Sequence, residues 1–338
     1  MKPKRFENLL FLSLHLCLYL GAADAGAASR EIVEQAKKEG EVVLYSTMPA
    51  TEFQTFSEAA KEKYPFLSVR HVRLSSSNQV ARVMLEHKAG KLGADVVGNN
   101  LSAMSYYKEQ GVLTKHESPE VSQILKGMAD PEGYWSGTTT DLLITGFNTK
   151  MMTRDKAPKN FNDYLDPRFK GQMGINWGAP YALVGMIELQ GEEKGIAYIK
   201  KLGQQAVRPV EGFNHMLNLL AAGEYPLVIF MQVSKVDVLK KKGGPVDWLS
   251  TLPTLATPAS VGATRRAPHP AAAKLLVDFY LSVEGQQALV RTGKIPLRRG
   301  VKSESPDIDK LLEERLHVIK TADYSRYTKI YNEALGMR

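Results

Sequence analysis

The chain has 338 residues, of which 43% are hydrophobic, a formal net charge of +8 and a single cysteine, Cys17. A chain of this length can bury a large core and is expected to form two domains, and one cysteine excludes an internal disulfide framework. The lysines and arginines are scattered along the chain, which argues against a nucleic-acid partner and favours an anionic ligand or an acidic docking partner.

The N-terminal segment has the three parts of a secretory signal peptide. A charged start within the first five residues precedes an apolar run over 9–20 and small residues over 21–29. The favoured cleavage site follows Ala25, so the predicted signal peptide is 1–25 and Cys17 is removed with it. The apolar run is shorter than the ~20 residues that span a bilayer. The sequence therefore predicts an exported protein.

Three strand–loop–helix units come next. The predicted strands are 41–45, 67–73 and 94–97, and the predicted helices end near Lys63, Ala89 and Glu109. Repetition of this unit predicts a mostly parallel sheet with helices on both faces, in which ligands bind beyond the carboxyl ends of the strands. Polar residues occupy those ends: Ser46, Thr47, Ser76, Ser77, Asn99 and Asn100.

The second half of the chain repeats the alternation. Extended segments are expected at 137–147, 171–177 and 225–232, and helices near 180 and at 214–222, 270–282 and 284–292. After Trp248 the chain is expected to be loop-like, because it contains Pro253, Pro258 and Gly262. The tail from Pro306 is expected to be helical and charged. This pattern predicts a second α/β half.

Catalytic and metal-binding motifs are missing from the sequence. It contains no nucleophile elbow, phosphate-binding loop, dinucleotide fingerprint or HExxH motif, and no two histidines lie at metal-ligand spacing on a helix. We therefore expect neither an enzyme nor a resident metal or cofactor. An exported transferase or lyase on the same scaffold stays open as an alternative.

Five short segments follow one another in an order typical of one family. They are GADVV (93–97), YLDPRFKG (164–171), LAAGE (220–224), APHPAAAK (267–274) and SVEGQQ (282–287). Together they resemble the solute-binding proteins of bacterial ABC importers, of the bilobal type related to ferric-ion-binding proteins. The resemblance implies two α/β lobes with mixed, mostly parallel sheets, joined by crossing hinge strands, as in type II periplasmic binding proteins. It also implies a membrane permease with a separate ATPase subunit as the partner.

The resemblance also implies how the chain divides into lobes. Lobe one would comprise about 30–140 and 255–338, and lobe two about 141–254. The crossings near 138–145 and 248–258 would form the hinge, and the ligand would lie in the cleft between the lobes.

Iron-binding members of the family hold the metal with two adjacent tyrosines, a histidine and a glutamate. The resemblance places these ligands near 231–233, Pro49 and Asn100, where the sequence has none of them. Tyr106 and Tyr107 are adjacent, but consecutive residues of a helix do not face one point. Ferric iron or an iron chelate therefore stays an alternative cargo, and a small anionic organic solute is the favoured one.

The remaining candidate ligand-binding residues are Arg73, Trp177, Asn214, His215 and Gln232. Arg73 offers a bidentate charge-assisted pair, Trp177 a stacking surface and Gln232 an amide at the end of a buried strand. Hydroxyl groups and helix amino termini suit a carboxylate, phosphate or phosphonate. The sequence thus predicts a monomeric periplasmic receptor that delivers such a solute to an importer and uses no cofactor.

Overall fold

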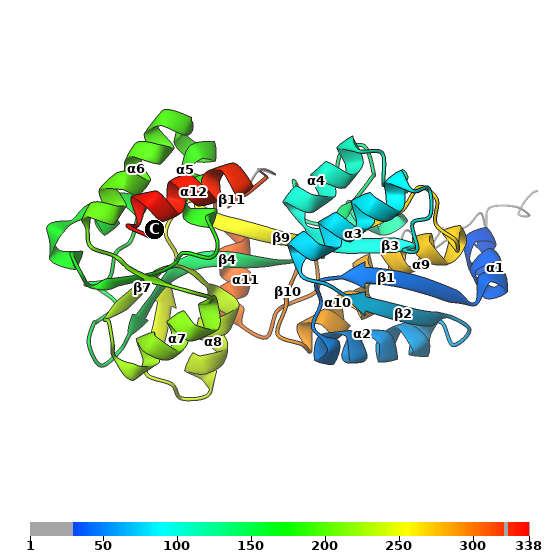
Figure 1. Cartoon of the computed structure of the whole chain (residues 1–338). Helices are drawn as coiled ribbons and strands as arrows, with labels where there is room; N and C mark the ends of the chain where they lie inside the picture. Colours follow the sequence, from blue (N-terminus) through cyan, green and yellow to red (C-terminus); the bar gives the residue numbers. More distant parts are fainter. Residues whose placement is uncertain (1–29, 321–323, 338) are drawn as a thin grey trace, which may run out of the picture.

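The computed structural model describes residues 30–320 and 324–337, so the predicted signal peptide lies outside the described residues. Figure 1 shows two α/β lobes side by side, with the long strands β4 (Ser136–Asn148) and β9 (Thr254–Ala263) running between them. Within the described ranges, no helix is long and apolar enough to cross a membrane.

The first lobe contains the three predicted strand–helix units. Its elements are α1 (Arg30–Glu39), β1 (Glu41–Ser46), α2 (Ala50–Lys63), β2 (Ser68–Arg73), α3 (Ser76–Lys88), β3 (Val96–Asn100), α4 (Leu101–Glu109), η1 (Pro119–Gln123), α9 (Pro270–Leu281), α10 (Val283–Val290) and β10 (Ile295–Pro296). Strand β1 pairs in parallel with β2 on one side and β3 on the other. Val42 and Leu44 pack into one core cluster, and Val43 and Tyr45 pack into another. Helices therefore cover both faces of the sheet, which explains the continuous apolar run of β1.

The two crossing strands join the lobes into one sheet. Strand β9 pairs antiparallel with β3 and with β4, and the main strand order is β2-β1-β3-β9-β4-β7-β5-β6. Register shifts interrupt β4 at Gly137/Thr139 against β9 and at Ile144/Gly146 against β7.

The expectation of a loop after Trp248 was wrong, because β8 (Val246–Leu249) and β9 are strands. Pro258 lies inside β9 and comes directly before Ala259, the last β9 residue that pairs with β3. Because β3 ends there, no β3 residue lies opposite Pro258, and the N–H that proline lacks leaves no β3 partner without a hydrogen bond.

The second lobe repeats the arrangement around a second parallel group of strands. Strand β5 (Met173–Asn176) pairs in parallel with β6 (Arg208–Val210) and with β7 (Leu227–Gln232). The other elements are η2 (Phe161–Leu165), η3 (Pro167–Phe169), α5 (Tyr181–Gln190), α6 (Glu192–Gln204), α7 (Phe213–Ala222) and α8 (Val233–Lys241). Two α/β lobes joined by crossing strands are the architecture expected from the sequence.

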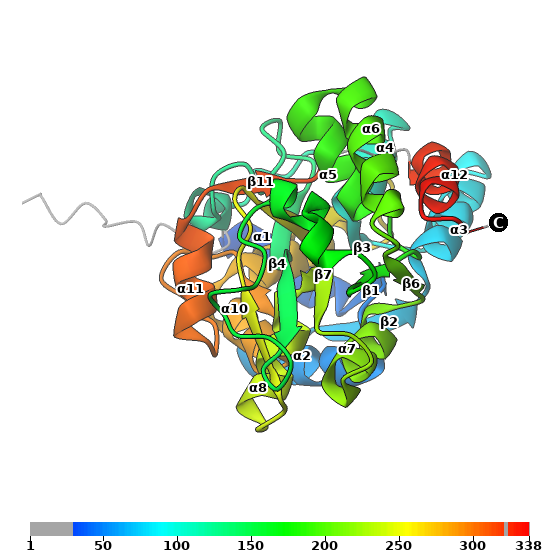
Figure 2. The same cartoon turned by 90° about the vertical axis from the view of Figure 1, so that its left-hand side faces the viewer.

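The C-terminal tail departs from the expected lobe division. It forms α11 (Pro306–Glu313), β11 (Leu316–Val318) and α12 (Tyr324–Ala334), and α12 packs on α5 and α6 of the second lobe (Figures 1 and 2). Tyr331 is buried there and its hydroxyl donates a hydrogen bond to the carbonyl oxygen of Asn176 at 3.1 Å. The tail was expected to be part of lobe one, and to be helical and charged; α11 and α12 are helices, with the short strand β11 between them. Its aromatic side chains instead enter the core of lobe two, and β11 pairs with β9.

Candidate functional site

A cavity of about 350 Å³ lies between the lobes, where β4 and β9 cross. We call it the inner cavity. Its lining residues come from both lobes and include the first residues of three helices: Ser76 of α3, Leu101 of α4 and Tyr181 of α5. Thr47 precedes α2, and Gln232 precedes α8. Five helix amino termini therefore lie at or close to this cavity.

A hydrogen-bonded polar cluster forms the wall of the first lobe. The Ser76 hydroxyl donates to the Asn99 side-chain oxygen at 2.8 Å, and the Asn99 amide donates to Gln79 at 2.7 Å. The Asn100 side-chain oxygen accepts from the Ala103 N–H at 2.9 Å and caps α4. Asn99 is 2% exposed and Gln79 is fully buried. Burial and mutual hydrogen bonds fix the positions of these side chains before any ligand arrives.

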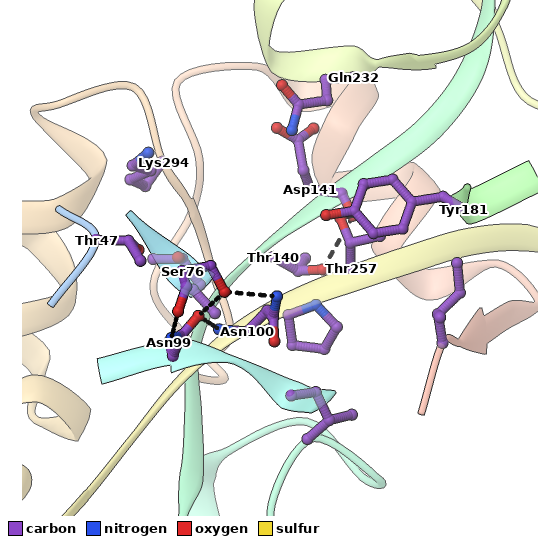
Figure 3. A pocket seen from close by; sticks show the side chains of 15 residues that line it. Thr47, Ser76, Asn99, Asn100, Thr140, Asp141, Tyr181, Gln232, Thr257 and Lys294 are labelled. Atoms are coloured by element: carbon purple, nitrogen blue, oxygen red, sulfur yellow. Dashed lines mark hydrogen bonds between the residues drawn. The ribbon is translucent and has the colours of Figure 1, made fainter. Parts of the chain in front are cut away.

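The crossing strands supply the floor of the cavity. Thr139, Thr140 and Asp141 lie on β4, and Thr257 lies on β9. The Asp141 carboxylate accepts a hydrogen bond from the Ser234 hydroxyl at 2.7 Å and from the Leu142 N–H at 3.0 Å. Burial raises the pKa of the Asp141 carboxyl, and these hydrogen bonds oppose the shift. Figure 3 shows the Gln232 amide pointing toward this carboxyl group.

Lys294 is the one cationic side chain among the described residues that line the inner cavity. Its ammonium group lies 3.1 Å from Oε1 of Glu52 on α2, and the Lys294 side chain is 39% exposed. The second oxygen of Glu52, Oε2, is buried and has no hydrogen-bond partner among the described residues. Lys294 thus has one charged contact and an accessible ammonium group at the edge of the cavity.

Tyr181 contributes a hydroxyl group from the second lobe. Burial raises the pKa of this phenol, and the charge of Asp141 raises it further. The hydroxyl group therefore stays protonated at neutral pH and can donate a hydrogen bond. The site as a whole offers hydroxyl and amide groups, one ammonium group and one carboxyl group, so it can bind a small polar molecule from both sides.

Comparison with known proteins now assigns the chain. A family model described as "Bacterial extracellular solute-binding protein" matches residues 94–326. The chain belongs to this family. An uncharacterized protein from Haemophilus influenzae is 25% identical over 284 residues, which cover 79% of this chain and 80% of that protein.

Solved structures share the fold of this solute-binding protein. Iron-bound HitA from Pseudomonas aeruginosa gives a TM-score of 0.71 at 20% identity, over 88% of this chain and 97% of HitA. The periplasmic binding protein AfuA from Actinobacillus pleuropneumoniae, with exogenous fructose-6-phosphate bound, gives 0.71 at 24% identity, over 89% of this chain and 100% of AfuA. Ferric iron-binding protein A from Mannheimia haemolytica, in an open conformation, gives a TM-score of 0.72 at 18% identity, over 87% of this chain and 98% of that protein. The fold is therefore that of the type II periplasmic binding proteins.

Five of the predicted site residues line the inner cavity of this solute-binding protein. They are Thr47, Ser76, Asn99, Asn100 and Gln232. Ser77 lines an adjoining cavity instead. Ser46 is 4% exposed and lies beneath the site. Its hydroxyl oxygen lies 2.8 Å from Nε2 of His71 and accepts a hydrogen bond from the Met48 N–H. Ser46 therefore supports the loop that carries Thr47.

The other four predicted residues do not line the inner cavity. Arg73 is exposed at the end of β2. Trp177 packs against the core of the second lobe, because its position after β5 turns it toward that core. Asn214 accepts a hydrogen bond from Lys235 at 2.7 Å in a cavity that shares Lys294 with the inner cavity, and His215 is exposed on α7.

Several lining residues were not predicted from the sequence. They are Thr139, Thr140, Asp141, Tyr181, Thr257, Lys294 and Ile319. The run Thr138–Asp141 carried a signal, since a polar stretch in an expected hinge strand has a reason to face the cleft. No local pattern in the sequence marked Lys294 and Ile319 as site residues, because the fold brings them to the cavity from positions far along the chain.

The positions at which the resemblance placed iron ligands have other surroundings here. Met231 and Val233 are fully buried in the core, and Asn100 caps a helix. Among residues 30–320 and 324–337, no three His, Cys, Asp or Glu side chains lie close enough together to hold a metal ion. The cavity offers hydroxyl and amide groups with one carboxyl group, that of Asp141, whereas bare ferric iron prefers several hard anionic oxygens.

Proposed function

We propose that this solute-binding protein is exported to the periplasm, works as a monomer and captures a small anionic organic solute in the inner cavity. It then delivers the solute to an ABC permease driven by a separate ATPase subunit. The observation that carries this proposal is that three helices begin at a cavity that both lobes line and that one lysine also reaches.

Helix amino termini favour negative charge for two reasons. Their first N–H groups have no partner within the helix, and the aligned peptide dipoles place partial positive charge at that end. Ser76, Leu101 and Tyr181 begin three such helices at the cavity. Lys294 adds a full positive charge. A carboxylate or phosphate group in this position would be stabilised from several directions.

The remaining groups suit a hydroxylated solute. Asp141, Gln232 and the threonines of β4 and β9 can accept hydrogen bonds from hydroxyl groups. A volume of about 350 Å³ is at the small end of ligand pockets. The fructose-6-phosphate bound to the structural neighbour AfuA combines these two features. Sugar phosphates and hydroxy acids are therefore the first solutes to test.

Binding would close the two lobes about β4 and β9. We place the hinge at 138–145 and 248–258, and we move α12 into the second lobe because it packs on α5 and α6. A solute that contacts Ser76 on one lobe and Gln232 on the other favours the closed form, whereas contact with one lobe alone does not. Converting a mostly open population to a mostly closed one takes about 5.5 kcal/mol of preference.

Calorimetry and thermal-shift measurements with the exported chain test the proposal. The panel contains sugar phosphates, hydroxy acids and phosphonates, their neutral counterparts, and ferric citrate and ferric chloride. We expect at least one organic anion to raise the melting temperature and its neutral counterpart to have no effect. Arg73→Ala serves as the control variant because Arg73 is exposed outside the cavity. Binding of neutral solutes or of ferric chloride alone would refute the anion proposal.

A further inference from the structure

A second and larger cavity adjoins the inner one. Its volume is about 900 Å³, and Ser76, Asn100 and Tyr181 line both cavities. Its walls also come from both lobes: α3 and α4 form one side, and the segment Gly178–Tyr181 with Thr328 of α12 forms the other. We call it the apolar cavity.

The lining of the apolar cavity differs in chemistry from that of the inner cavity. Apolar atoms make up most of its lining surface, and Ser77, Ser102 and Thr328 add hydroxyl groups. The carbon-rich side chains are Val80, Ala81, Ala103, Tyr106, Ala179 and Pro180. Tyr106 is 36% exposed, one of the few large apolar side chains with that much exposure among the described residues. Glu109 is the one charged residue in the described lining, and its carboxylate would repel an anionic group. An apolar or aromatic group would be accommodated here.

The opposite end of the cleft has the reverse character. A third cavity of about 380 Å³ shares Lys294 with the inner cavity, and Lys235 and Lys242 also line it. Glu52 is the one acidic residue in its described lining, so positive charge predominates. We call it the lysine cavity. From the lysine cavity through the inner cavity to the apolar cavity, the cleft changes from cationic to polar to carbon-rich.

From this gradient we infer that the solute is amphipathic, with an anionic group toward Lys294 and an aromatic or alkyl group in the apolar cavity against Tyr106. The inference rests on the proposed function and adds to it the class of the solute and its orientation. An aromatic group that leaves water for this cavity removes apolar surface of its own and of Tyr106, which favours binding. Offset stacking on the tyrosine ring adds to that gain.

Matched pairs of ligands test the inference by calorimetry on the exported chain. Methyl phosphate is compared with phenyl phosphate, and lactate with phenyllactate, so that each pair keeps its anionic group and differs in its apolar part. We expect the aromatic member to bind at least about tenfold more tightly. Tyr106→Ala should reduce that ratio toward unity and leave the smaller member unchanged. Leu85→Ala is the control, because Leu85 is a 71% exposed apolar residue of α3 that lies outside all three cavities.

The outcomes separate the two proposals. Equal affinities within both pairs would overturn the amphipathic solute and leave the anion receptor intact. A ratio that Tyr106→Ala does not change would overturn the placement of the aromatic group. Failure of all four anions to bind at millimolar concentration, while a neutral solute binds, would overturn the anion receptor and this inference with it.

Discussion

Lys294 and Glu52 form an ion pair, and replacing one or the other should change anion affinity in opposite directions. The ammonium group lies 3.1 Å from Oε1 of Glu52 and at the edge of the inner cavity. In Lys294→Met the cavity loses its cation, so anion affinity falls. In Glu52→Gln the lysine keeps its charge and loses a competing carboxylate, so anion affinity rises.

The magnitude follows from the geometry of the pair. A solute anion that contacts the same ammonium group would lie about 6 Å from the Glu52 carboxylate, where two unit charges repel by about 3 kcal/mol at an effective dielectric of 20. Solvent exposure and salt reduce this repulsion, because the Lys294 side chain is 39% exposed. We therefore expect Glu52→Gln to tighten anion binding by about 1 kcal/mol, or about fivefold.

The two changes should also differ in their effect on folding. Glu52→Gln removes a charge whose Oε2 atom is buried without a partner, so the free energy of unfolding should change by less than about 1 kcal/mol. Lys294→Met leaves that charge unpaired and should cost about 1–3 kcal/mol. Calorimetric titration at two salt concentrations and urea unfolding measure both effects. Equal weakening of anion binding in both variants would refute the reasoning.

Three further predictions concern other parts of the molecule. Gln232→Glu should weaken anion binding about tenfold more than Gln232→Ala, as measured by calorimetry, because the new carboxylate faces the solute; equal losses would contradict this. Gly203→Ala should lower the free energy of unfolding, measured by urea denaturation, by about 1–3 kcal/mol, because a Cβ at this position would overlap the Ala334 carbonyl oxygen. Gly191→Ala is the comparison: a Cβ there meets no other atom, so any loss of stability comes from the positive φ of that residue alone. Anion affinity should fall as the pH rises through the raised pKa of Asp141, because the ionised carboxylate repels the solute. Asp141→Asn should flatten this pH dependence. The same raised pKa means that the contribution of Asp141 to the free energy of unfolding is present at low pH and is lost as the pH rises.

Local patterns predicted the units that repeat along the chain. The apolar run at Val42–Tyr45 predicts a strand, and helices cover both faces of the sheet that contains it. Carboxyl ends of parallel strands meet at one edge, so Thr47, Ser76, Asn99 and Asn100 could be grouped without coordinates.

Long-range packing decided what the sequence did not predict. Pro258 favours a loop, yet it lies in β9 because pairing with β3 ends beside it. Lys294 and Ile319 reach the cavity through turns whose direction no local pattern encodes. Trp177 has a ring that could stack on a ligand, but it lies half-buried against the core of the second lobe. Side-chain direction, rather than residue type, separates the predicted residues that line the cavity from those that do not.

The connection between the lobes is a ladder of hydrogen bonds and not a flexible linker. Strands β4 and β9 stay paired from Ser136 to Leu143, and the ladder is irregular only at the Gly137/Thr139 shift. A paired ribbon resists shear and bends most easily where its pairing is offset. We therefore expect each lobe to rotate as a rigid body about the β4–β9 pair, which bends when the lobes close. After the solute leaves, the bent strands return to their resting conformation, and the cleft reopens with no input of energy from outside. Amide hydrogen exchange along the two strands would then be fastest beside that offset and slow on either side of it.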